Sequence, residues 1–107
     1  MKVKELIEKL SLEVLCEGED REISGCYSGD LLSWVMSRAK DGDVWLTVMG
    51  NVNAVAVAVL SDCACIVLTE NSPLDDVAKE KAIQQGVTFL SSGRNAYELS
   101  VEISKLI

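Results

Sequence analysis

Four cysteines are the most reactive side chains of this sequence: Cys16, Cys26, Cys63 and Cys65. The chain has no histidine, which removes Ser-His and Cys-His nucleophile pairs and the commonest metal ligand. The Cys63-Ala64-Cys65 spacing would place two thiols on one face of a strand, where a metal or redox site with a third cysteine is one interpretation. We favour the other, small buried strand residues, because free cysteine is usually buried. We therefore expect no metal and no cofactor.

Small polar residues also gather where four predicted strands end. In open parallel sheets, ligands bind beyond the carboxyl ends of the strands. Ser92-Gly93-Arg94, before a predicted helix, could hold an anion with backbone N–H groups and a guanidinium. Ordinary cap and turn chemistry is the alternative, and it explains each segment singly. The candidate ligand-binding residues at these ends are Asp30, Asn51, Asn53, Thr69, Ser92, Gly93 and Arg94.

A second candidate group lies earlier in the chain, where Asp20 and Arg21 precede Ser24 and Gly25. An Asp-Arg step leading into a Ser-Gly turn is suited to fixing a loop through hydrogen bonds to backbone groups. The same four residues could instead contact a ligand, since loops of α/β folds carry function. Both interpretations stay open from the sequence.

The elements that must position these residues centre on Asp43 to Glu70, which we interpret as strand, helix, strand. Val44 to Val48 and Cys65 to Thr69 are β-rich runs, and a crossover between them predicts a parallel pair. Asn51 and Asn53 are cap residues, which favours a helix over Ala54 to Leu60. This segment also alternates like a strand, so a central strand remains the alternative.

The flanking segments alternate between strand and helix. We expect strands over Leu12–Cys16, Ile23–Tyr27 and Val87–Leu90, and helices over Lys2–Leu10, from Asp30 as N-cap, from Ser72-Pro73 to Gly86, and from Asn95 with Glu98 as a capping box. Leu74, Val77, Ala78 and Ala82 are expected to face inward. The order predicts an α/β fold: a three-layer sandwich with a mainly parallel central sheet flanked by helices.

Composition limits the partners. The 107 residues predict one domain over 1–107, and a net charge of −7 argues against nucleic-acid and anionic-membrane binding. No signal-peptide pattern opens the sequence and no apolar stretch is long enough to span a bilayer, so we expect a cytoplasmic protein.

The helix predicted over Ala54 to Leu60 contains no polar residue. A sheet can cover one side of such a helix, and a contiguous exposed apolar patch is rare in soluble monomers. We therefore expect a homodimer, with Val55, Val57 and Val59 at its interface.

The segment Asp20-Arg21-Glu22-Ile23-Ser24-Gly25-Cys26 resembles the motif of the DRTGG domain family. Asp20 and Arg21 match its first pair, Ser24 and Gly25 match its Thr-Gly, and Cys26 replaces its last glycine. Three later segments are also similar: Tyr27 to Met36, Gly42 to Trp45 and Asn53 to Leu60.

The resemblance implies a non-catalytic regulatory module that senses a ligand or joins subunits. The polar residues at the four strand ends, with Arg94, indicate a small anionic ligand such as a nucleotide. Similar domains accompany CBS pairs in regulated pyrophosphatases and resemble the N-terminal domain of HPr kinase. The chain has no phosphate-binding P-loop motif, so we expect no HPr kinase activity. A redox-responsive accessory partner of an iron-sulfur or hydrogenase system is one alternative, and a small enzyme is another.

Overall fold

A five-stranded sheet organises the computed structural model, which describes residues 1–107. The strand order is β1-β5-β4-β3-β2; β2, β3, β4 and β5 are parallel, and β1 is antiparallel to β5. The elements in chain order are α1 (Val3–Leu10), β1 (Glu13–Cys16), β2 (Gly25–Ser28), α2 (Leu32–Arg38), β3 (Asp43–Thr47), α3 (Val52–Ser61), β4 (Cys65–Leu68), α4 (Asp76–Gln85), β5 (Phe89–Ser91) and α5 (Ala96–Ser104).

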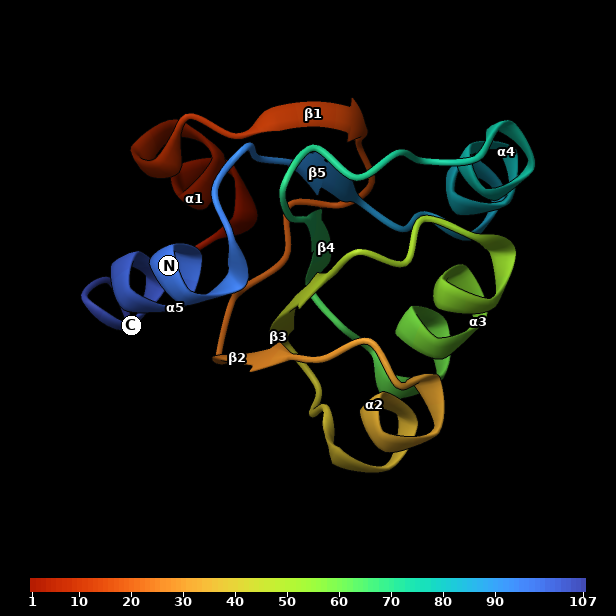
Figure 1. Ribbon diagram of the computed structural model, residues 1–107, viewed down its shortest axis with the longest axis horizontal. Helices are drawn as coiled ribbons and strands as arrows, with labels where there is room; N and C mark the ends of the chain where they lie inside the picture. Colours follow the sequence, from red (N-terminus) through yellow and green to blue (C-terminus); the bar gives the residue numbers. More distant parts are fainter.

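Helices cover both faces of this sheet, so the predicted three-layer sandwich is confirmed (Figure 1). On one face, α1 and α5 bury a cluster that includes Leu6, Val67 and Leu99. On the other face, α2, α3 and α4 bury a cluster that includes Trp45 and Ile66. None of the helices is long and apolar enough to cross a membrane.

The central strand–helix–strand unit forms as predicted. Strands β3 and β4 pair in parallel, and every residue of both is buried, as expected for strands covered on two faces. The helix between them is α3, so the helical interpretation of Ala54 to Leu60 is confirmed and the strand alternative is wrong. The Asn51 side chain caps this helix by accepting a hydrogen bond from the backbone N–H of Ala54 at 3.0 Å.

Two predicted helix starts are wrong because other hydrogen bonds take their polar groups. Asp30 does not cap α2, which begins at Leu32 after Leu31. Its carboxylate instead accepts hydrogen bonds from the Thr47 hydroxyl and the Val48 N–H, and so ties the start of α2 to the end of β3.

Helix α4 likewise starts later than expected, at Asp76 rather than after Ser72. The Ser72 hydroxyl donates to the Thr69 carbonyl, and Pro73 packs its backbone against Gly50. Ala78 and Ala82 face inward as predicted, but Val77 is exposed.

Both predicted helix signals near the C-terminal end of the chain are confirmed. Gly86 ends α4 in the left-handed conformation, with a φ of 71°. Asn95 and Glu98 form the capping box of α5, whose Leu99 and Ile103 are buried.

Candidate functional site

The candidate ligand-binding residues fall into two groups at opposite ends of the sheet. Because β2 to β5 run in parallel, segments before these strands lie at the amino end of the sheet and segments after them at the carboxyl end. Asp20, Arg21, Ser24 and Gly25 lie at the amino end. Asp30, Thr69 and Ser92 to Arg94 lie at the carboxyl end, so the two groups do not form one site.

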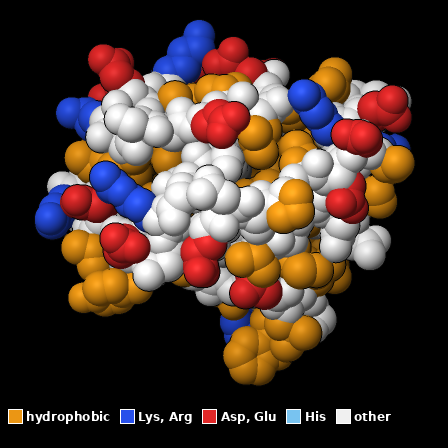
Figure 2. Space-filling model, turned by 45° about the horizontal axis from the view of Figure 1, so that its top comes forward, with side chains coloured by type: hydrophobic (Ala, Val, Ile, Leu, Met, Phe, Trp, Pro, Cys, Tyr) orange, Lys and Arg blue, Asp and Glu red, His pale blue; other side chains and the backbone are white.

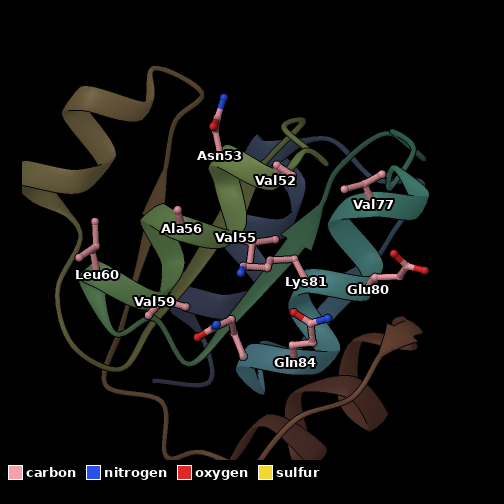
Figure 3. Close-up of a pocket in the computed structure, with 11 residues that line it drawn as sticks. Val52, Asn53, Val55, Ala56, Val59, Leu60, Val77, Glu80, Lys81 and Gln84 are labelled. Atoms are coloured by element: carbon pink, nitrogen blue, oxygen red, sulfur yellow. The ribbon is translucent and has the colours of Figure 1, made fainter.

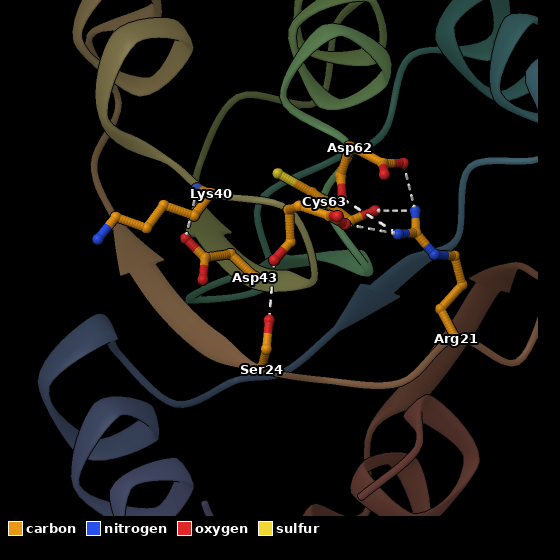
Figure 4. Close-up of polar contacts among 7 residues, drawn as sticks. Arg21, Ser24, Lys40, Asp43, Asp62 and Cys63 are labelled. Carbon is orange, nitrogen blue, oxygen red and sulfur yellow. Dashed lines mark hydrogen bonds and ion pairs between the residues drawn. The ribbon is translucent and has the colours of Figure 1, made fainter.

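At the amino end, Arg21 joins three segments of the chain (Figure 4). Its guanidinium donates to the Asp62 carboxylate at 2.8 Å and carbonyl at 3.3 Å, to the Cys63 carbonyl at 3.1 Å and to the Asp41 carboxylate at 3.2 Å. These hydrogen bonds hold the pKa of the Asp62 carboxyl below its usual value, with the Arg21 contact as the largest cause. Arg21 therefore braces the turns that precede β3 and β4.

The neighbours of Arg21 are also occupied within the chain. The Asp20 carboxylate accepts from the Lys4 N–H at 2.9 Å, and the Ser24 hydroxyl donates to the Asp41 carbonyl at 2.8 Å. A Cβ atom at Gly25 would lie 2.6 Å from the Asp43 carboxylate, so a glycine permits this close approach. The loop-fixing interpretation accounts for all four residues at this end.

The cysteines are not arranged as the Cys-Ala-Cys spacing suggested. Cys63 precedes β4, and its side chain belongs to the core cluster that α2, α3 and α4 cover. Cys65 lies in β4, and its side chain belongs to the cluster on the other face of the sheet, which α1 and α5 cover. The expectation of one shared face is wrong because strand alternation does not extend to Cys63. Burial raises the pKa of the Cys63 thiol to about 12, and no cluster of three or more His, Cys, Asp or Glu side chains is placed to hold a metal ion.

At the carboxyl end, several candidate residues have structural partners. Asp30 binds the end of β3, Asn51 caps α3, and the Thr69 side chain is buried. Asn53 does not cap a helix: it lies in the first turn of α3, on a groove between α3 and α4.

The Ser92–Arg94 loop is held against the loop that follows β4. The Asn71 N–H donates to the Ser92 carbonyl at 2.9 Å, the Glu70 N–H donates to the Arg94 carbonyl at 3.0 Å, and Gly93 packs beside the Asn71 side chain. The Glu98 carboxylate accepts a hydrogen bond from the Asn95 N–H in the capping box, so a carboxylate of the chain itself already occupies the N-terminus of α5, where an anion was predicted to bind. The Arg94 guanidinium makes no ion pair and is the free cation of this loop.

Beside this loop lies a hollow of about 370 Å³, which we call the strand-end hollow. Lys79 lines this hollow and was not predicted from the sequence. It lies on α4, about one helical turn after Asp76, and its ammonium makes no ion pair. The contribution of β1 was not predicted either. The residues that line the hollow are Glu13, Leu15, Asn71, Ser72, Pro73, Leu74, Asp76, Lys79 and Ser91.

A larger and more apolar groove, of about 670 Å³, separates α3 from α4 (Figure 3). Val52, Val59 and Val77 line it, and the Lys81 side chain reaches across it toward Val55. This α3–α4 groove lies on the sheet face opposite α1 and α5 (Figure 1).

No family model and no curated protein matches this chain. Its fold is similar to a solved structure, the CBS and DRTGG domains of the regulatory region of Clostridium perfringens pyrophosphatase complexed with activator, diadenosine tetraphosphate. The match has a TM-score of 0.69 at 11% identity and covers 92% of this chain and 44% of that chain. The chain thus spans less than half of that structure, and the likeness supports a DRTGG-like fold.

Proposed function

We propose that this chain is a non-catalytic regulatory module of the DRTGG type that binds a small anionic ligand, such as a nucleotide. The observation that carries the proposal is the fold likeness to a regulatory region that was solved with a nucleotide activator. The Asp20 to Gly25 motif adds to it, because this segment forms the brace between the turns that precede β3 and β4. We expect the module to act in the cytoplasm.

We place the ligand at the strand-end hollow. Lys79, which lines the hollow and makes no ion pair, would attract an anion on a chain whose net charge is −7. Arg94 lies in the adjoining loop but lines a separate hollow with Tyr97 and Glu98 of α5, so it would act on the anion from a greater distance. Asn71 and Ser72 add an amide and a hydroxyl as hydrogen-bonding groups. Glu13 and Asp76 also line the hollow, so we expect weak binding.

The alternatives have less support. A redox-responsive role would need reactive thiols, but Cys16, Cys63 and Cys65 are buried and burial raises the pKa of each. Cys26 is exposed, but desolvation and the nearby Asp43 raise the pKa of its thiol to about 11. A small enzyme would need a nucleophile or an acid–base pair with perturbed pKa values in a cleft. The pKa of the Asp62 carboxyl is lowered within a polar cluster, but the main cause is its hydrogen bond with Arg21, which braces the fold.

A thermal-shift panel tests the proposal. The protein is titrated with adenine and guanine mononucleotides and with diadenosine tetraphosphate up to millimolar concentration. A ligand at ten times its Kd stabilises the folded state by about 1.4 kcal/mol, which is a shift of several degrees for a domain of this size. We expect Lys79→Ala to weaken the shift at least threefold, and Arg94→Ala to weaken it less, because Arg94 lines a separate hollow.

Arg38→Ala is the matched control, because Arg38 is a cation on α2 that lies over the Trp34 ring and lines no part of the hollow. The nucleotide proposal is wrong if no nucleotide moves either the Tm or the amide NMR spectrum. It also fails if Arg38→Ala weakens binding as much as Lys79→Ala does, since binding would then follow overall charge.

A further inference from the structure

The outer face of α3 and α4 is apolar and exposed. Val59 is 43% exposed, Leu60 71% and Val77 64%, and all three line the α3–α4 groove. Hydrophobic atoms gather on the right of Figure 2, the side on which α2, α3 and α4 lie in Figure 1. Soluble monomers seldom leave a continuous apolar surface of this kind uncovered.

The structure changes which residues of α3 can meet a partner. Val55 and Val57, predicted at an interface, are only 1% and 5% exposed, because the sheet and the neighbouring helices α2 and α4 cover them. The exposed stripe follows the helical period instead and consists of Val52, Ala56, Val59 and Leu60. Of the three predicted interface residues, Val59 belongs to this stripe.

The charge of this face indicates what kind of partner fits it. Helix α3 carries no charged residue, and the charged residues that line the groove are Glu80 and Lys81, one of each sign. Neither makes an ion pair within the chain. The chain as a whole has a net charge of −7, so a cationic partner would be drawn to other surfaces.

We propose that a second copy of this chain covers the α3–α4 face across a two-fold axis. A neutral face lets two chains of like net charge approach each other at this place. In a two-fold contact every residue of the face meets the same face, so Glu80 of one copy can pair with Lys81 of the other. Ala56, at the middle of the exposed stripe, is small enough to let the two α3 helices lie close together.

The size of the face sets the strength of the contact. Two ten-residue helices, each about 15 Å long and packed 8–10 Å apart, present a face of roughly 300 Å² in projection. Helix α2, which packs against α3, extends the face with exposed Leu31 and Trp34. A standard interface buries about 800 Å² per partner, so this dimer belongs at the weak end and is expected to dissociate on dilution.

Sedimentation velocity from 5 to 500 μM tests the proposal. We expect the weight-average mass to rise with concentration from 11.6 kDa toward twice that value. Leu60→Glu should stay monomeric over the whole range, and because Leu60 is largely exposed the variant should keep its circular dichroism spectrum and Tm. Tyr97→Glu is the matched control: Tyr97 is 77% exposed on α5, in the opposite layer, so this variant should associate like the parent.

A charge exchange distinguishes a two-fold contact from general stickiness. Glu80→Lys and Lys81→Glu each place like charges opposite each other and should weaken association at least fivefold. The double variant restores the pairing and should recover it. A monomeric parent at 500 μM overturns the proposal, and so does a dimer that Leu60→Glu leaves intact. Neither result decides whether a nucleotide binds, since the strand-end hollow shares no residue with the groove.

Discussion

Replacing Arg21 with alanine should destabilise the fold without touching either proposed surface. The guanidinium donates four hydrogen bonds, two of them to carboxylates and two to backbone carbonyls. The Asp41 and Asp62 side chains are largely exposed, so each ion pair is screened and contributes about 0.2–1 kcal/mol. Losing a charged partner of the Cys63 carbonyl adds about 1 kcal/mol or more. We expect a loss near 2 kcal/mol, within a range of about 1–3 kcal/mol.

Urea denaturation at pH 7 measures this loss, and a thermal scan should show a Tm lower by about 8 °C for a domain of roughly 100 residues. Arg21→Lys keeps the charge but not the planar fork, so its stability should lie between the parent and Arg21→Ala. Arg38→Ala is the matched control: Arg38 stacks over the Trp34 ring, and its removal should cost about 0.5–1 kcal/mol.

The stability difference between parent and Arg21→Ala should also depend on pH. The Asp62 carboxyl has a lowered pKa in the folded state, so its contribution is present above the unfolded value of 3.8 and is lost as the pH falls through the folded value. The difference should therefore be constant near neutral pH and shrink below about pH 4. An Arg21→Ala variant within 0.5 kcal/mol of the parent at pH 7 would refute the brace. If that variant also lost nucleotide binding, Arg21 would be a ligand contact.

Three further predictions follow from single contacts. Asp30→Ala leaves the buried Thr47 hydroxyl without its acceptor and should lower the free energy of unfolding by about 1–3 kcal/mol in urea, with Asp30→Asn closer to the parent. Gly50→Ala places a Cβ against the Pro73 carbonyl and should cost about 1–3 kcal/mol by the same assay. Burial raises the pKa of Cys63 to about 12 and that of Cys26 to about 11, so Cys63 holds roughly tenfold less thiolate at pH 8; because Cys26 is also the exposed one, a thiol reagent should modify it first, and equal rates in single-cysteine variants would contradict this.

The sequence was most informative where local signals agreed with one another. The β-branched runs of β3 and β4, the Asn51 cap and the Asn95–Glu98 capping box each act within a few residues, and all of them are present in the structure. The same reasoning failed at Asp30 and Ser72. Both are good cap residues, but other hydrogen bonds of their side chains compete with capping. The Asp30 contact depends on how distant segments pack, whereas the Ser72 hydroxyl bonds a carbonyl three residues earlier in the chain.

The candidate site was harder to predict than the fold because it depends on long-range order. Arg21 finds its partners 20 to 42 residues away, so its role as a brace has no local signature. The strand-end hollow is completed by Glu13 and Leu15, since β1 joins the sheet beside β5, the last strand of the chain. The order of strands and helices along the chain does not indicate that β1 pairs with β5.

Helix α4 lies between the two proposed surfaces and gives the molecule a physical link between them. Asp76 and Lys79 line the strand-end hollow, while Val77, Glu80 and Lys81 line the α3–α4 groove. Adjacent residues of one rigid helix thus face different sites. A ligand that shifts α4 would change the affinity of the dimer, and dimer formation would change the affinity for the ligand by the same factor. Binding assays should therefore use Leu60→Glu beside the parent, because the difference between them isolates this coupling.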